Sequence, residues 1–148
     1  MINFTNMRNH LPEYHEDKSL WAYQYCANVN DRKEVRKYIT KKEDAYWYCK
    51  EVKDRPEIRK YITDSYHAFM YCRNIEDKKE VRKNITNSNW AYMYCTQMKD
   101  RPDVYKYITE SIDAYMYCQD IEDRPEIRKY ITEDHHLQLY HRWKNWQC

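Results

Sequence analysis

The cysteines are the residues whose type and spacing most invite a chemical role, either as metal ligands or as redox groups. Five of the six recur every 23 residues, at positions 26, 49, 72, 95 and 118. Structural metal sites need paired thiols such as C-x-x-C, whereas each repeat supplies one thiol. Disulfides need Cα atoms within ~7 Å, but stacked helices lie ~8–10 Å apart. We therefore expect these cysteines to be buried packing groups.

A second candidate for metal chemistry is a histidine cluster near the end of the chain. His135, His136 and His141 precede Cys148, and these four side chains could in principle hold zinc. Their spacing matches no standard set of zinc ligands, so we favour a polar capping helix there. No serine or cysteine stands beside a histidine in a recurring pattern. The sequence therefore predicts a protein that is not an enzyme and that binds no metal and no cofactor.

The composition excludes several other functional classes. The 148 residues include no glycine, so neither a G-x-G-x-x-G loop nor a Walker loop can form. The 26 basic and 24 acidic residues give a formal net charge of +2, which argues against a strongly basic nucleic-acid binder. No apolar stretch approaches the ~20 residues of a membrane span, and the N-terminus has no signal-like apolar segment. We therefore expect a cytoplasmic protein with no membrane contact.

The elements that position these residues belong to a tandem repeat. Alanine, aspartate and isoleucine columns keep the 23-residue spacing of the cysteines, and the string DRPEIRKYIT occurs at 54–63 and again at 123–132. Fixed periods of this length indicate solenoids or arrays. A helical hairpin so short cannot bury its own apolar face, so neighbouring repeats must stack. We predict an all-α, right-handed α-solenoid of short helix-turn-helix repeats.

Local patterns divide each repeat into two helices. Ala45, Tyr48 and Cys49 fall at i, i+3 and i+4, which predicts one apolar stripe on a longer helix. The DRPE segment predicts the start of a shorter helix of about two turns, with Asp54 as its N-cap. Thr63 ends that helix, and we expect it to cap the next longer helix.

The repeats define the expected domain organisation. We predict a single repeat domain over 1–148, with an N-terminal capping segment at 1–19, five repeats at 20–132 and a C-terminal capping unit at 133–148. Terminal repeats of solenoids are atypical because their outer faces meet solvent. The oligomeric state stays open.

Strings such as DRPEIRKYIT followed by DAYMYC resemble short tandem helical repeats in uncharacterised proteins of bacteriophages and other large DNA viruses. The resemblance covers residues 20–132, which is most of the chain. It implies a viral or phage origin. It implies no settled activity, and it carries no catalytic residues to this chain.

The positions at which the repeat varies are the best indication of function. On the longer helices, positions equivalent to 43, 47 and 50 vary, and at ~100° per residue they share a face opposite the core. The position equivalent to 47 is Trp or Met in four repeats of five. Methionine suits adaptable binding surfaces and tryptophan suits hot spots, so we predict a protein–protein interaction module that binds or blocks a host partner. The candidate binding residues are Trp47, Tyr66, Met70, Arg73, Met93, Ile112 and Met116.

Three alternatives stay open. A second copy of the chain or a second layer could cover the same apolar row. The chain could be a self-assembling structural protein. A basic ridge on the shorter helices could instead bind nucleic acid, as in helical repeats that read RNA, although a solvated charged face is the plainer explanation. The ridge residues are Arg36, Lys37, Arg59, Lys60, Arg82, Lys83, Arg128 and Lys129.

Overall fold

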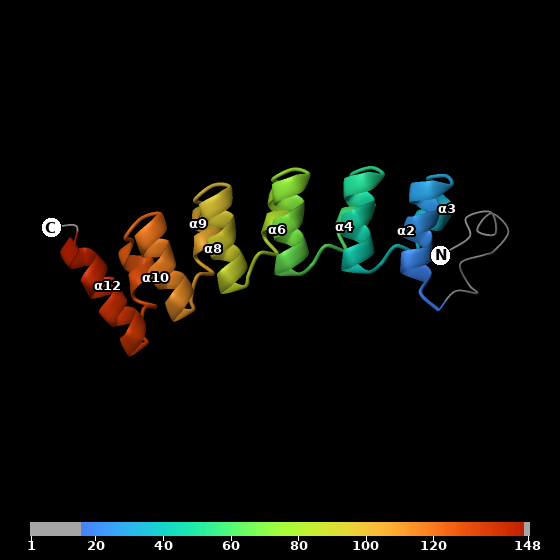
Figure 1. Ribbon diagram of the computed structural model, residues 1–148. Helices are drawn as coiled ribbons and strands as arrows, with labels where there is room; N and C mark the ends of the chain where they lie inside the picture. The colour runs from blue at the N-terminus through green and yellow to red at the C-terminus, as the bar shows by residue number, and fades with distance from the viewer. Residues whose placement is uncertain (1–15, 147–148) are drawn as a thin grey trace. The chain divides into compact units, whose positions relative to one another are not determined.

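The computed structural model describes residues 16–146, and every regular element in that range is an α-helix (Figure 1). Longer helices alternate with short ones of four residues each, so the short helices are half the expected length. The prediction of an all-α fold built from helix-turn-helix repeats is confirmed. The longer helices are α2 (Lys18–Asn28), α4 (Lys42–Glu51), α6 (Ser65–Asn74), α8 (Ser88–Gln97), α10 (Ser111–Asp120) and α12 (Asp134–Trp146). The short helices are α3 (Lys33–Arg36), α5 (Pro56–Arg59), α7 (Lys79–Arg82), α9 (Pro102–Tyr105) and α11 (Pro125–Arg128).

The chain groups into two compact units, unit 1 at residues 1–84 and unit 2 at residues 85–148. In unit 1, α2 packs against α4 and α4 against α6, while in unit 2 α8 packs against α10 and α10 against α12. Each short helix packs on the longer helix that precedes it. One continuous domain and a right-handed superhelix stay predictions, and the predicted N-terminal cap lies outside the described residues up to residue 15.

The predicted apolar stripe forms the core of each unit. Ala45 and Tyr48 are fully buried and Cys49 is nearly so, while Ile58 and Ile62 of the following short segment close over them. Fully burying a large apolar side chain contributes roughly 2 kcal/mol. The alanine column lets neighbouring longer helices approach closely, so we attribute its constancy to packing.

The aspartate that was expected to cap the short helix has a different role, and that prediction is wrong. Arg55 occupies the N-cap position of α5 without a side-chain cap bond, whereas the Asp54 carboxylate accepts hydrogen bonds from Arg59 at 2.5 Å and from the Tyr71 hydroxyl at 2.8 Å. Tyr71 belongs to the next longer helix, α6. The aspartate therefore ties one repeat to the next.

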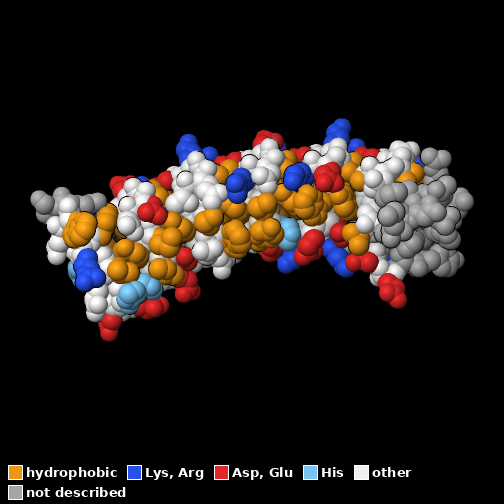
Figure 2. Space-filling model, in the orientation of Figure 1, with side chains coloured by type: hydrophobic (Ala, Val, Ile, Leu, Met, Phe, Trp, Pro, Cys, Tyr) orange, Lys and Arg blue, Asp and Glu red, His pale blue; other side chains and the backbone are white. Residues whose placement is uncertain are grey.

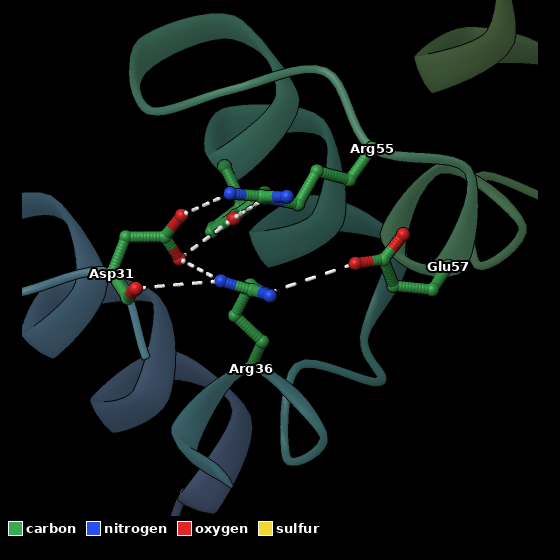
Figure 3. Close-up of polar contacts among 5 residues, drawn as sticks. Asp31, Arg36, Arg55 and Glu57 are labelled. Carbon is green, nitrogen blue, oxygen red and sulfur yellow. Dashed lines mark hydrogen bonds and ion pairs between the residues drawn. The ribbon is translucent and has the colours of Figure 1, made fainter. Parts of the chain in front are cut away.

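The same bonds recur along each unit and form an Asp–Arg–Tyr ladder. Figure 3 shows one rung of this ladder. The Asp31 carboxylate accepts a hydrogen bond from Arg36 of its own repeat at 3.0 Å and one from Arg55 of the following repeat at 2.9 Å. The Tyr48 hydroxyl donates to the same carboxylate at 2.8 Å. Hydrogen bonds to charged groups contribute about 1.5–3 kcal/mol each, so the ladder adds directional bonds to an otherwise apolar interface. In unit 2 the equivalent rungs are Asp100 with Tyr117 and Arg124, and Asp123 with Arg128 and Tyr140.

Serines of one repeat cap the longer helix of the next. Ser19 Oγ accepts hydrogen bonds from the backbone amides of Thr40 and Lys41 at 3.1 and 3.0 Å, at the start of α4. Ser88 and Ser111 do the same for α10 and α12. The expected threonine caps are therefore wrong, since α6 itself is capped by Asp64, whose carboxylate accepts from the His67 amide.

Helix α12 closes the last rung of the ladder. Tyr140 donates to Asp123 at 2.9 Å, and the Lys144 ammonium pairs with the same carboxylate. Lys144 thus takes the place that Arg124 holds in the preceding rung. Among the described helices, none combines the length and the apolar character that crossing a membrane requires.

Candidate protein-interaction face

The outer face consists of the positions equivalent to 43, 47 and 50 on the longer helices, which point away from the core. Four of the five large apolar side chains that are exposed in residues 16–146 lie on it, and the fifth, Trp146, is at the end of α12. Figure 2 shows hydrophobic side chains gathered over the longer helices of each unit, with charged side chains beside them. The four residues are Leu20, Trp47, Tyr66 and Ile112.

In unit 1, the outer face carries three of these side chains on successive helices. Leu20, Trp47 and Tyr66 are 38%, 40% and 44% exposed, and Met70 is half-buried beside them. The Trp47 ring lies edge-on to Tyr46 at 5.2 Å, and the Lys50 ammonium lies 4.7 Å from its centroid. These two contacts favour the orientation in which the Trp47 ring lies on the surface, which lowers the entropic cost of binding a partner there.

Basic side chains border this apolar patch on one side. Lys50 and Arg73 occupy equivalent positions on α4 and α6, both are exposed, and neither forms an ion pair among the described residues. Glu43 is exposed at the opposite end of the face. The patch therefore presents apolar contacts next to two cations, which suits a partner that carries carboxylates beside apolar side chains.

In unit 2, the outer face carries exposed Ile112, while Met93 and Met116 are half-buried. The expectation that the methionine row points outward is therefore only partly met, because both methionines are half-buried. Side chains on α10 and α12 also enclose a groove of about 500 Å³. Its lining is Tyr115, Gln119, Leu139, Arg142, Trp143 and Trp146.

The sequence interpretation missed this groove because it treated the last helix as a polar cap. The signal was present in Leu139, Trp143 and Trp146, whose spacings of four and three residues place them on one side of a helix. Trp146 is 92% exposed. A polar capping helix would not carry these residues on one face, so α12 belongs to the candidate interaction face.

The predicted arginine–lysine ridge separates into two groups. Arg36, Arg59 and Arg82 are buried at 9%, 8% and 7% exposure, because they form the ladder with aspartates. Arg128 is half-buried and pairs with Asp123 at 2.7 Å. The prediction of an exposed ridge is therefore wrong for Arg36, Arg59 and Arg82, whereas the Arg128 side chain is 41% exposed. The lysines are exposed as expected, namely Lys37, Lys60, Lys83 and Lys129.

The five repeated cysteines are buried and free, which confirms the packing interpretation. Burial raises the pKa of Cys26 and of Cys118 to about 11. Burial also raises the pKa of Cys49, Cys72 and Cys95 to about 12. A thiolate is the reactive form of cysteine, so these thiols are poorly suited to nucleophilic or redox chemistry. Cys148 lies outside the described residues.

The histidine cluster is spread over α12. His135 and His141 are exposed, whereas His136 is half-buried, with Nδ1 2.9 Å from Ser111 Oγ and 3.6 Å from the Glu133 carboxylate. Within residues 16–146, no group of three or more His, Cys, Asp or Glu side chains is arranged to hold a metal ion. His136 therefore contributes to the serine cap of its own helix.

These features define an all-α helical repeat protein with an exposed apolar face on its longer helices. Comparison of the chain with protein-family models, with curated proteins and with solved structures finds no match. The geometry of the two units therefore carries the argument about function.

Proposed function

We propose that the protein is a non-enzymatic interaction module that binds a partner protein through the outer face of its longer helices. The observation that carries this proposal is that Leu20, Trp47 and Tyr66 share the outer face of unit 1 while each remains more than a third exposed. Large exposed aromatic side chains on a rigid helical scaffold are typical of binding hot spots. A host-cell protein is the expected partner, on the resemblance of the repeats to those of viral and phage proteins.

The partner's chemistry follows from the border of the patch. An amphipathic segment with an apolar stripe would cover Trp47 and Tyr66, and acidic side chains beside that stripe would meet Lys50 and Arg73. These two cations have no ion-pair partner among the described residues, so pairing them breaks no existing salt bridge. We therefore commit to a partner segment that is apolar on one side and acidic along its edge.

The test is selection of a displayed random peptide library against the full chain, with counterselection against Trp47→Glu. Enriched peptides should carry apolar residues at helical spacing flanked by Asp or Glu. Their measured affinity should fall at least about ten-fold for Trp47→Glu and for Arg73→Glu, since hot-spot truncations cost about 2 kcal/mol or more. Lys53→Glu is the matched control, because Lys53 is exposed in the loop between α4 and α5.

Circular dichroism of each variant should show unchanged helix content, since the substituted side chains are exposed. If the enriched peptides bind Trp47→Glu as tightly as the wild type, the outer face is not the binding surface. Analytical sedimentation of the chain alone tests whether a second copy of the chain covers the outer face. A dimer that Trp47→Glu converts to monomer would mean that a second copy covers this face instead.

A further inference from the structure

A groove of about 450 Å³ lies between the short helices α3 and α5, on a different surface of unit 1 from the outer face. Four of its seven lining residues are cationic and one is acidic. The chain as a whole carries a net charge of only +2, so positive charge is concentrated at this groove. The lining is Lys33, Arg36, Lys37, Glu57, Ile58, Lys60 and Tyr61.

The groove recurs in the next repeat. A second groove of about 270 Å³ lies between α5 and α7, and Lys60 lines both of them. Lys37, Lys60 and Lys83 hold equivalent positions in three successive repeats and are all exposed. A row of cations at the repeat spacing matches a linear polyanion better than a single small anion. The second lining is Pro56, Arg59, Lys60, Thr63, Glu80, Lys83 and Asn84.

The first groove also contains a buried donor that is only partly used. Arg36 is nine-tenths buried, and its Nη1 atom donates to Asp31 at 3.0 Å. Its Nε–H has no hydrogen-bond partner. The Glu57 carboxylate lies 3.8 Å from this atom, which is beyond hydrogen-bonding distance (Figure 3). Leaving a buried N–H unpaired is unfavourable. The Nε atom is closed to solvent in this conformation, so a ligand oxygen would gain this bond once the neighbouring side chains shift to admit it.

Apolar and aromatic groups complete the lining. Ile58 is buried and Tyr61 is half-buried, with the Lys60 ammonium 5.0 Å from the Tyr61 ring centroid. Proteins that bind single-stranded nucleic acid combine a positive groove with aromatic rings on which bases stack. Ligand pockets have volumes of roughly 300–1,000 Å³, so the first groove can admit a base. The second groove is smaller and suits the sugar–phosphate backbone of a nucleic acid without a base.

We propose that this surface of unit 1 binds single-stranded nucleic acid. Phosphates pair with Lys37, Lys60 and Lys83, one phosphate oxygen accepts the bond from Arg36 Nε, and a base rests against Tyr61. Lysines that recur at the repeat spacing beside an aromatic lining fit a chain that alternates phosphates with flat bases, so nucleic acid is the occupant to which we commit. This proposal concerns a different surface from the outer face, and each can fail without the other.

The test is fluorescence anisotropy of a fluorescein-labelled oligothymidine titrated with the full chain at low salt and then over a salt series. Lys60→Glu should weaken binding about ten-fold or more and reduce the slope of log affinity against log salt by about 0.7 for the lost phosphate contact. Lys53→Glu is the matched control, because Lys53 is exposed and lines neither groove. It should bind like the wild type.

Glu57→Gln tests the same groove independently, because this substitution should raise the affinity for the oligonucleotide. It removes the one carboxylate from the first groove, so binding should tighten several-fold. Loss of affinity in this variant would contradict the placement of the phosphate. Equal weakening by Lys60→Glu and Lys53→Glu, or no anisotropy change at low salt, would overturn the proposal. Displacement of the oligonucleotide by poly-glutamate at equal charge concentration would show that the groove binds acidic chains without regard to bases.

Discussion

Replacement of Asp31 by asparagine tests whether the Asp–Arg–Tyr ladder, rather than helix capping, explains the aspartate column. Asparagine has nearly the same shape but no charge, so packing is retained while Arg36 and Arg55 lose the carboxylate that they share. Arg36 and Arg55 both donate to this carboxylate, at 3.0 and 2.9 Å. If Asp31 were only a helix cap, asparagine would replace it at little cost, because both residues are good N-caps.

The expected magnitude follows from the burial of the partners. Charge-assisted hydrogen bonds contribute about 1.5–3 kcal/mol each. The Arg36 side chain is 10% exposed and keeps most of this value, whereas the Arg55 side chain is 27% exposed and is partly screened by solvent. We therefore expect Asp31→Asn to lower the free energy of unfolding by about 3 kcal/mol. For a unit of this size that corresponds to a fall in Tm of roughly 12 °C or more.

Glu57→Gln is the matched control because Glu57 faces the same arginine from the solvent side. Its carboxylate lies 3.8 Å from Arg36 Nε, and its side chain is 53% exposed. Such surface pairs contribute between 0 and about 1 kcal/mol, so the control should unfold within a few degrees of the wild type. The assay is urea and thermal unfolding followed by circular dichroism. Hydrogen exchange would then show whether the protection lost by Asp31→Asn is concentrated in residues 31–62.

A loss below about 1 kcal/mol for Asp31→Asn would refute the ladder as a stabilising device. So would equal losses for Asp31→Asn and Glu57→Gln, because burial would then not govern the contribution of each carboxylate.

Two further predictions concern protonation and thiol reactivity. Burial raises the pKa of Asp31, but bonds from its arginines and from Tyr48 more than offset this, so its pKa in the folded chain lies below its usual value. The ladder's contribution should therefore be complete near neutral pH and should be lost as pH falls below about 4, with Tm falling less steeply in Asp31→Asn than in the wild type. In a Cys148→Ser variant, the native protein should react with a thiol reagent only slowly at about pH 8, because its thiols are buried with pKa values of about 11 to 12. All five should react in denaturant, and rapid labelling of the native chain would contradict the packing role.

The helices and their buried faces could be predicted from local patterns. Ala45, Tyr48 and Cys49 recur at helical spacing in a fixed period, and their burial follows because a helix with one apolar stripe must cover it. The period also predicted stacking, since no single repeat can form a core. These inferences succeeded because each depends on residues within one turn or one period of one another.

The roles of the charged residues could not be predicted in this way. Asp31 has the spacing of a helix cap, and its two ladder partners, Tyr48 and Arg55, stand 17 and 24 residues further along the chain. Local spacing cannot distinguish a carboxylate that caps a helix from one that reaches into the next repeat. The aromatic groove of α12 escaped prediction for a similar reason, because Tyr115 and Trp143 meet only when α10 and α12 pack together.

Arg36 and Lys37 illustrate the limit of what local sequence patterns can predict about the basic residues. The sequence by itself determined the period, the two helices of each repeat, the buried Ala, Tyr and Cys columns and the positions that vary. It presented Arg36 and Lys37 as equivalent members of one basic row. Neighbouring residues lie about 100° apart around a helix, so stacking buries Arg36 against the aspartates and leaves Lys37 in solvent. Only the packing of one repeat on the next decided which cations hold the fold together and which remain exposed for a ligand.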